Sequence, residues 1–144
     1  MTACSGKKTD AAQKTDTEEN PNALIQAAAG NDITEARRLT AAGTDVNAQD
    51  DDGKTALMWA AYKNCTDMAG LLLAAGADTD AKDNDGQTAL MYASQRNAAA
   101  VAELLIAAGA DMDAKNNNGE TALMMAARRG HTDIAELLKA TGAR

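Results

Sequence analysis

Histidine, cysteine and methionine are the side chains here that could hold a transition metal, and their spacing argues against such a site. Cys65 and His131 occupy equivalent positions two repeats apart in a 33-residue period. Stacked helices pack about 10 Å apart, so these two side chains should be about 20 Å apart, too far to share a metal. Met58, Met91 and Met124 recur one period apart, too far to share a copper ion. Packing in the core explains the methionines better.

Nucleophilic and calcium-dependent chemistry are also poorly supported. His131 is the only histidine, and no repeat places a serine or cysteine beside an acid as a nucleophilic site requires. The aspartate-rich turns resemble calcium loops, but alanine and large side chains occupy two of the ligand positions. The first ligand position holds Ala48, Ala81 or Ala114, and the closing glutamate position holds Trp59, Tyr92 or Met125. We therefore expect no enzyme activity, no cofactor and no metal site.

Composition and charge restrict the class of protein. The 144 residues are 45% hydrophobic and 24% charged, which is typical of one soluble globular domain. The apolar residues are mostly Ala and Leu, and Phe is absent, so the core must be built from many small contacts between helices. A net charge of −7 opposes binding to nucleic acid or to anionic lipid surfaces. We expect neither as a general partner.

A period of 33 residues organises the chain. The segments TALMWAA at 55–61, TALMYAS at 88–94 and TALMMAA at 121–127 begin at intervals of 33 residues. A fixed period of this size indicates a stacked array of one supersecondary unit. The period predicts a domain over residues 17–144 whose four repeats are 17–49, 50–82, 83–115 and 116–144.

Each repeat predicts a turn and two short helices. Asp52-Gly53 and its equivalents form tight turns, since Gly adopts positive φ without a Cβ clash. The Thr that follows can cap a first helix, which should end near Asn64, and a second helix should run from about Thr66 to Gly76. Such short helices are marginal alone and must bury their apolar faces against neighbouring repeats.

The outer repeats replace apolar residues of the second helix with polar ones. Arg38 and Thr40 in the first repeat stand where the middle repeats have leucine or isoleucine, and Lys139 does so in the last. Polar residues on the end repeats are typical of solubilising caps. We therefore expect an array of four complete units.

The pattern D-x-x-G-x-T-A-L-x-x-A-A, followed by L-L-x-x-G-A-D, resembles the ankyrin repeat over about residues 20–144. The resemblance implies an all-α solenoid of stacked helix-turn-helix units with short β-hairpin-like turns. The family's Pro after the Thr is Ala here, and its usual His two places later is Ile25, Met58, Met91 or Met124. The bonds that this His makes to neighbouring turns are therefore absent, and we expect packing to replace them.

The resemblance also implies a function, which is to bind another protein through a concave surface made of the turn tips and the first helices. The tip positions are Asp51, Asp52, Lys54, Asn84, Asp85, Gln87, Asn117, Asn118 and Glu120. The groove positions, near the end of each first helix, are Tyr62, Lys63, Gln95, Arg96, Arg128 and Arg129. The groove is thus basic and the tips are acidic to neutral. We expect the chain to be a monomer.

The aromatic residues have two interpretations. Trp59 and Tyr92 occupy equivalent positions one repeat apart, and Tyr62 lies on the same helix face as Trp59. In the first, Trp59 and Tyr92 fill the space between adjacent first helices. In the second, they form with Tyr62 and the arginines a hot spot that contacts the partner. Both can hold, since a ring can pack on one face and bind on the other.

The first 16 residues differ from the rest of the chain. They are polar, so we expect a flexible tether. The opening T-A-C-S-G resembles the end of a bacterial lipoprotein signal, which implies a lipidated Cys4 and a membrane-anchored protein of the periplasm. The alternatives are that Cys4 is an incidental thiol and that the protein is cytoplasmic.

Two functions follow from these expectations. The first is a binding module of the bacterial envelope that masks, inhibits or stabilises a partner such as a periplasmic hydrolase or peptidase. The second is a passive scaffold or adaptor that joins two proteins without altering either.

Overall fold

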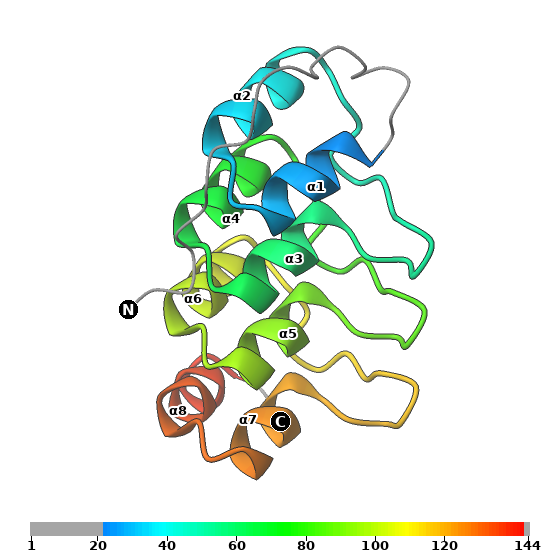
Figure 1. Ribbon diagram of the computed structural model, residues 1–144. Helices are drawn as coiled ribbons and strands as arrows, with labels where there is room; N and C mark the ends of the chain where they lie inside the picture. Colours follow the sequence, from blue (N-terminus) through cyan, green and yellow to red (C-terminus); the bar gives the residue numbers. More distant parts are fainter. Residues whose placement is uncertain (1–21, 143–144) are drawn as a thin grey trace.

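The computed structural model describes residues 22–142, which form eight α-helices and contain no strand. In chain order the helices are α1 Ala23–Ala29, α2 Ile33–Ala41, α3 Ala56–Lys63, α4 Thr66–Ala74, α5 Ala89–Arg96, α6 Ala99–Ala107, α7 Ala122–Arg128 and α8 Thr132–Ala140. Consecutive helices pair, and the pairs stack in one file from α1 and α2 to α7 and α8 (Figure 1). The predicted all-α solenoid is confirmed.

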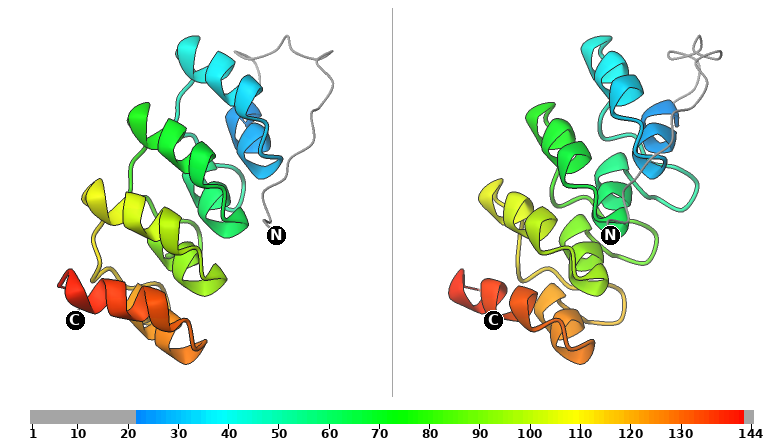
Figure 2. Two further views of the ribbon diagram at one scale, coloured as in Figure 1. Left: turned by 90° about the vertical axis from the view of Figure 1, so that its left-hand side faces the viewer. Right: turned by 60° about the vertical axis from the view of Figure 1, so that its left-hand side comes forward.

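The helices form two layers. The odd-numbered helices α1, α3, α5 and α7 pack against one another, and the even-numbered helices make a second layer alongside them, which faces the viewer on the left of Figure 2. Each long turn projects from the side of the odd-numbered layer, so the turn tips form a row along the stack (Figure 1). No helix within residues 22–142 combines the length and the apolar character needed to cross a membrane.

The predicted caps and stops place the first helices. The hydroxyl of Thr55 accepts from Met58 N at 3.2 Å, and Thr88 and Thr121 make the same bond in their repeats. Asn64, in the left-handed conformation with φ 61°, ends α3 where the sequence predicts. These local signals fix where α3 and α5 begin and end and where α7 begins.

Two turn tips require glycine both for its positive φ and because a Cβ would collide with the next turn. Gly53 and Gly86 have φ of 80° and 78°. A Cβ at Gly53 would lie 2.9 Å from Asn84 N, and one at Gly86 would lie 2.8 Å from Asn117 N. These glycines therefore let each turn pack closely against the next one.

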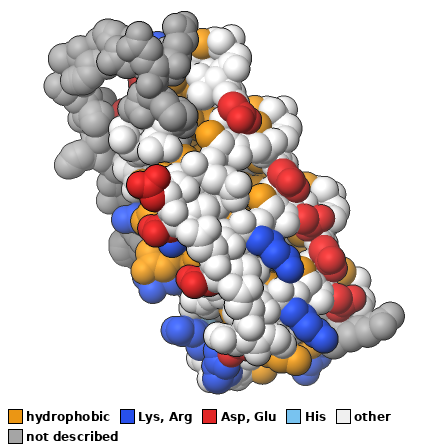
Figure 3. Space-filling model, turned by 90° about the vertical axis from the view of Figure 1, so that its right-hand side faces the viewer, with side chains coloured by type: hydrophobic (Ala, Val, Ile, Leu, Met, Phe, Trp, Pro, Cys, Tyr) orange, Lys and Arg blue, Asp and Glu red, His pale blue; other side chains and the backbone are white. Residues whose placement is uncertain are grey.

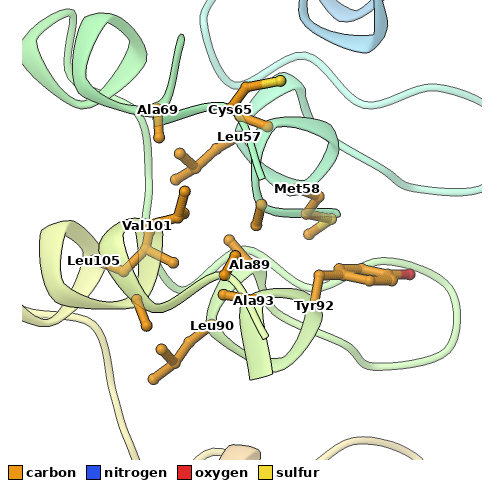
Figure 4. Close-up of a cluster of buried hydrophobic side chains, with 14 of the residues drawn as sticks. Leu57, Met58, Cys65, Ala69, Ala89, Leu90, Tyr92, Ala93, Val101 and Leu105 are labelled. Atoms are coloured by element: carbon orange, nitrogen blue, oxygen red, sulfur yellow. The ribbon is translucent and has the colours of Figure 1, made fainter. Parts of the chain in front are cut away.

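The core runs through the whole stack between the two layers. Leu57 and Leu90 are each 1% exposed, and Figure 4 shows them with Val101 and Leu105 of α6 and with alanines of α4 and α5, where neighbouring repeats meet. Alanine is frequent in this core because the helix backbones approach closely. The expectation of many small contacts rather than large rings is consistent with this packing.

The last repeat departs from the expected packing of the methionines. Met58 and Met91 are 1% exposed, whereas Met124 is 48% exposed, because no repeat within the described residues packs beneath α7. Core packing therefore explains the first two methionines and not the third. The polar end residues Arg38 and Lys139 are exposed, and Arg38 pairs with Glu35 at 2.5 Å.

Hydrogen bonds, and not packing alone, replace the missing histidines between turns. Asn84 bonds the preceding turn twice, through its N–H to Asp52 O at 2.9 Å and through its side chain to Asp51 O at 3.1 Å. Asn117 repeats both bonds one repeat later, to Asp85 O and Asn84 O, each at 3.0 Å. The expectation that packing substitutes for these bonds is corrected accordingly.

Candidate functional site

An aromatic and cationic cluster lies where α3 and α5 meet. The ring of Tyr62 contacts Trp59 and Tyr92 edge to face, with centroids 5.8 Å and 6.0 Å away. The guanidinium carbon of Arg96 lies 4.5 Å from the centroid of the Tyr62 ring. Tyr62 is 37% exposed and Arg96 is exposed, so this cluster presents one cation–π pair to solvent. We call these four residues the aromatic cluster.

Tyr92 belongs to the interior of that cluster. It is 6% exposed, and its hydroxyl donates to the carboxylate of Asp83, which is itself 7% exposed. Burial, followed by this bond to Asp83, raises the pKa of Tyr92. The expectation that Tyr92 offers surface to a partner is corrected: its ring fills the space between first helices and supports Tyr62.

Trp59 is the equivalent residue one repeat earlier, and it differs from Tyr92 in its polar atom. The ring packs against the core and is partly buried. Its Nε1 is buried and has no hydrogen-bond partner among the described residues. The indole N–H is therefore inaccessible to a partner, and Trp59 can contribute only ring surface.

A polar hollow lies beside the aromatic cluster, between the turns of the third and fourth repeats. Its volume is about 410 Å³. It is lined by Asp85, Gln87, Gln95, Asn116, Asn117, Asn118, Glu120, Met125, Arg128 and Arg129. We call it the repeat 3–4 hollow.

Hydrogen bonds between side chains fix the walls of this hollow. Gln87 Oε1 accepts from Gln95 at 3.0 Å and from Asn116 at 3.3 Å. Asn116 also donates to Glu120 Oε1 at 3.1 Å, and Gln95 contacts Met125 Sδ at 3.5 Å. The network joins α5 of the third repeat to the turn and first helix of the fourth, so the hollow is formed before any partner arrives.

An ion pair continues the network at one edge. Arg128 bonds the second carboxylate oxygen of Glu120, and this bond, followed by that from Asn116, holds the pKa of Glu120 below its usual value. Arg128 was expected to contribute positive charge to the groove, but its ion pair with Glu120 offsets that charge. Arg129, at the end of α7, is exposed and makes no ion pair within residues 22–142.

The side chains at the turn tips differ in their exposure to solvent and in whether their polar groups are already hydrogen-bonded. Asp51, Asp52 and Asp85 are exposed, whereas Lys54, Gln87 and Glu120 are partly buried. Asn84 and Asn117 commit their amide groups to the preceding turn. Figure 3 faces the tips and shows Lys and Arg side chains beside hydrophobic ones on one side, toward the end of the array, while Asp and Glu predominate along the other side.

His131 and Cys65, which were considered as metal ligands, contribute to the packing of the repeats. His131 Nδ1 lies 2.7 Å from the carbonyl oxygen of Ser94, which links the fourth repeat to the third. Cys65 is 2% exposed at the start of α4. Within residues 22–142 no three histidine, cysteine, aspartate or glutamate side chains come together as a metal site would require.

The sequence pattern of the family described as ankyrin repeats (3 copies) matches residues 2–83 and 71–144. The chain belongs to the ankyrin-repeat family. The resemblance drawn from the sequence is thus confirmed, and ankyrin repeats indicate a module for protein–protein interaction. A search of curated proteins finds no match.

Sequence reasoning missed the residues that organise the site. Asp83 anchors Tyr92, and Asn116 links Gln87 to Glu120. Asp50, Asp83 and Asn116 recur at the 33-residue interval, which is the signal that could have found them. Cys4 and the proposed tether over residues 1–16 lie outside the described residues, so both stay predictions.

Proposed function

We propose that this ankyrin-repeat protein is a stoichiometric binding module of the bacterial envelope that masks, inhibits or stabilises an enzyme through its concave face. The observation that carries the proposal is the stacking of Arg96 on Tyr62, at 4.5 Å, on the exposed side of α3 and α5. Interfaces concentrate binding energy in aromatic and arginine side chains that are already held in place.

The cluster is well suited to a partner because the fold does not need its exposed half. The buried rings of Tyr92 and, in part, Trp59 hold Tyr62 from below, and Tyr62 in turn positions Arg96. Little side-chain entropy would be lost on binding, since these groups are held before the partner arrives. Arg96 and Arg129 can each bond a carboxylate with two parallel N–H groups.

The inhibitory role is tested by capture of the partner and by its turnover. The array should retain an envelope enzyme, such as a hydrolase or peptidase, from the native organism, and one equivalent should change that enzyme's turnover. Arg96→Glu should weaken the effect, and Glu103→Lys, an exposed charge reversal on α6, is the matched control. A captured partner whose turnover stays constant at one equivalent would favour the adaptor function instead.

The envelope location rests on Cys4 and has its own test. The natural gene should yield a membrane-associated protein that carries an acyl group at Cys4 and becomes soluble as Cys4→Ser. Cys65 is the only other cysteine, and the sulfur of Cys4 cannot carry a lipid and a disulfide to Cys65 together. An unmodified Cys4 in a cytoplasmic fraction would contradict the proposed location, whereas an intact mass that shows this disulfide would contradict the lipid anchor alone.

A further inference from the structure

We propose that the repeat 3–4 hollow binds an extended acidic segment of the partner, with Arg129 bonding a glutamate or aspartate side chain and Gln95 bonding the segment's main chain. The inference rests on the proposed function, because it specifies which chemistry the concave face recognises. It concerns a different set of contacts from the aromatic cluster, so it can fail alone.

The hydrogen-bond network determines which polar atoms of the hollow remain available. Gln87 Oε1 already accepts two bonds, and both oxygens of Glu120 are engaged. The amide nitrogen of Gln95 donates to Gln87 Oε1 and to Met125 Sδ. Gln95 Oε1 accepts no bond from the described residues, so it can take a main-chain N–H of a partner. Carboxamides suit a peptide because an extended chain presents N–H and C=O groups in alternation.

Charge sets the orientation of the segment. Arg128 offsets Glu120, so the charges left open in the hollow are those of Asp85 and Arg129. Asp85 lies on the turn tip of the third repeat and Arg129 at the end of α7. A carboxylate in the hollow is therefore repelled at the tip end and attracted at the helix end, where the arginine fork can bond it twice.

The size of the hollow fits a short segment and not a folded surface. About 410 Å³ is near the lower end of the volumes that ligand sites enclose. Met125 is 2% exposed, so it offers little surface itself and instead holds Gln95 at the wall through the contact of its Sδ with Gln95 Nε2 at 3.5 Å. The segment is therefore a few residues long and carries one acidic side chain, which lies at the Arg129 end of the hollow.

The test uses blocked tripeptides as probes and backbone amide NMR of the intact chain. Acetyl-Ala-Glu-Ala-amide should shift the amides of Gln95, Glu120 and Arg129 in a saturable way at millimolar concentration, and the Gln and Lys peptides should not. Arg129→Gln should weaken the Glu peptide about tenfold, as loss of a charged hydrogen bond does. Arg37→Gln, an exposed arginine on α2, is the matched control and should change nothing.

Several outcomes would overturn the inference. Equal shifts with the three peptides, equal losses in the two arginine variants, shifts confined to other surfaces, or no saturable shift at about 20 mM would each do so. Arg129 is exposed, so its variant should keep its melting temperature. An enzyme captured through Tyr62 and Arg96 but indifferent to Arg129→Gln would leave the proposed function standing and remove this inference alone. Peptide binding at the repeat 3–4 hollow without inhibition of any enzyme would leave this inference standing and remove the proposed inhibitory function.

Discussion

Arg96 and Tyr62 come from different repeats, and the guanidinium carbon of Arg96 lies over the Tyr62 ring, 4.5 Å from its centroid. The contact joins the end of α5 to the end of α3, so two repeats present one surface. The role of this contact in partner binding is proposed, but its contribution to the free energy of unfolding can be measured in the chain without a partner.

A double-mutant cycle with Tyr62→Ala and Arg96→Ala should give a coupling energy of about 0.5–1 kcal/mol in the free energy of unfolding, the range of an exposed cation–π pair. Denaturant titrations of the four proteins provide the values. The same cycle with Arg37→Ala, on α2, should give no coupling. A coupling near zero for Arg96 as well would mean that the pair is not formed in solution.

The methionines provide a matched test of the stack. Met91→Ala should destabilise the chain by about 2–5 kcal/mol because Met91 is 1% exposed. Met124→Ala, at the equivalent position but 48% exposed, should cost less than about 1 kcal/mol. Equal losses in chemical denaturation would show that α7 has a neighbour the described residues do not include.

A pair of glycines separates backbone strain from close approach. Gly86 and Gly119 have φ of 78° and 79°, but only at Gly86 would a Cβ meet the next turn, 2.8 Å from Asn117 N. Gly119→Ala should cost about 1–2 kcal/mol from the left-handed backbone alone. Gly86→Ala should cost at least about 1 kcal/mol more, because the turn must also move. Similar melting temperatures for the two variants would argue against the tight packing of turns.

The Tyr92–Asp83 contact predicts a dependence of stability on alkaline pH. The pKa of Tyr92 is raised in the folded state, chiefly by burial. The folded chain therefore holds this proton more tightly than the unfolded chain, whose tyrosines ionise near about pH 10. The stabilisation is complete below that pH and should be lost as the pH rises above it.

Tyr92→Phe is the control for that dependence, because it keeps the ring and removes the ionisable hydroxyl. Chemical denaturation between neutral and alkaline pH should show the native chain losing more stability above about pH 10 than the variant does. Identical pH profiles would mean that Tyr92 is accessible to solvent.

The parts of the fold that depend on local chemistry were predictable from the sequence. The Thr55 cap, the stop at Asn64 and the turn at Gly53 follow from backbone preferences that act within a few residues. They were readable because each recurs at the 33-residue interval.

Contacts between repeats were less predictable. The Asn84 bonds to the preceding turn, the burial of Tyr92 on Asp83 and the sharing of Gln87 Oε1 depend on how neighbouring repeats are positioned in space. Met124 has the same residue type and position as Met91, and only the absence of a described repeat beneath α7 makes it exposed. The positions of the basic groove residues were predictable from the repeat, but the pairing of Arg128 with Glu120 depends on how the turn packs beside α7 and was not.

The central claim is that the concave face at α3 and α5 is the working surface, and one affinity comparison tests it most directly. With the captured partner, calorimetry should show Arg96→Glu weakening binding by about 1 kcal/mol or more, the range of a hot-spot residue. The melting temperature of the array should fall by no more than the few degrees that loss of the cation–π pair implies. Glu103→Lys on the outer face of α6 should bind as the native chain does. Loss of binding in Glu103→Lys with native affinity in Arg96→Glu would show that the even-numbered helices form the interface and would contradict the account.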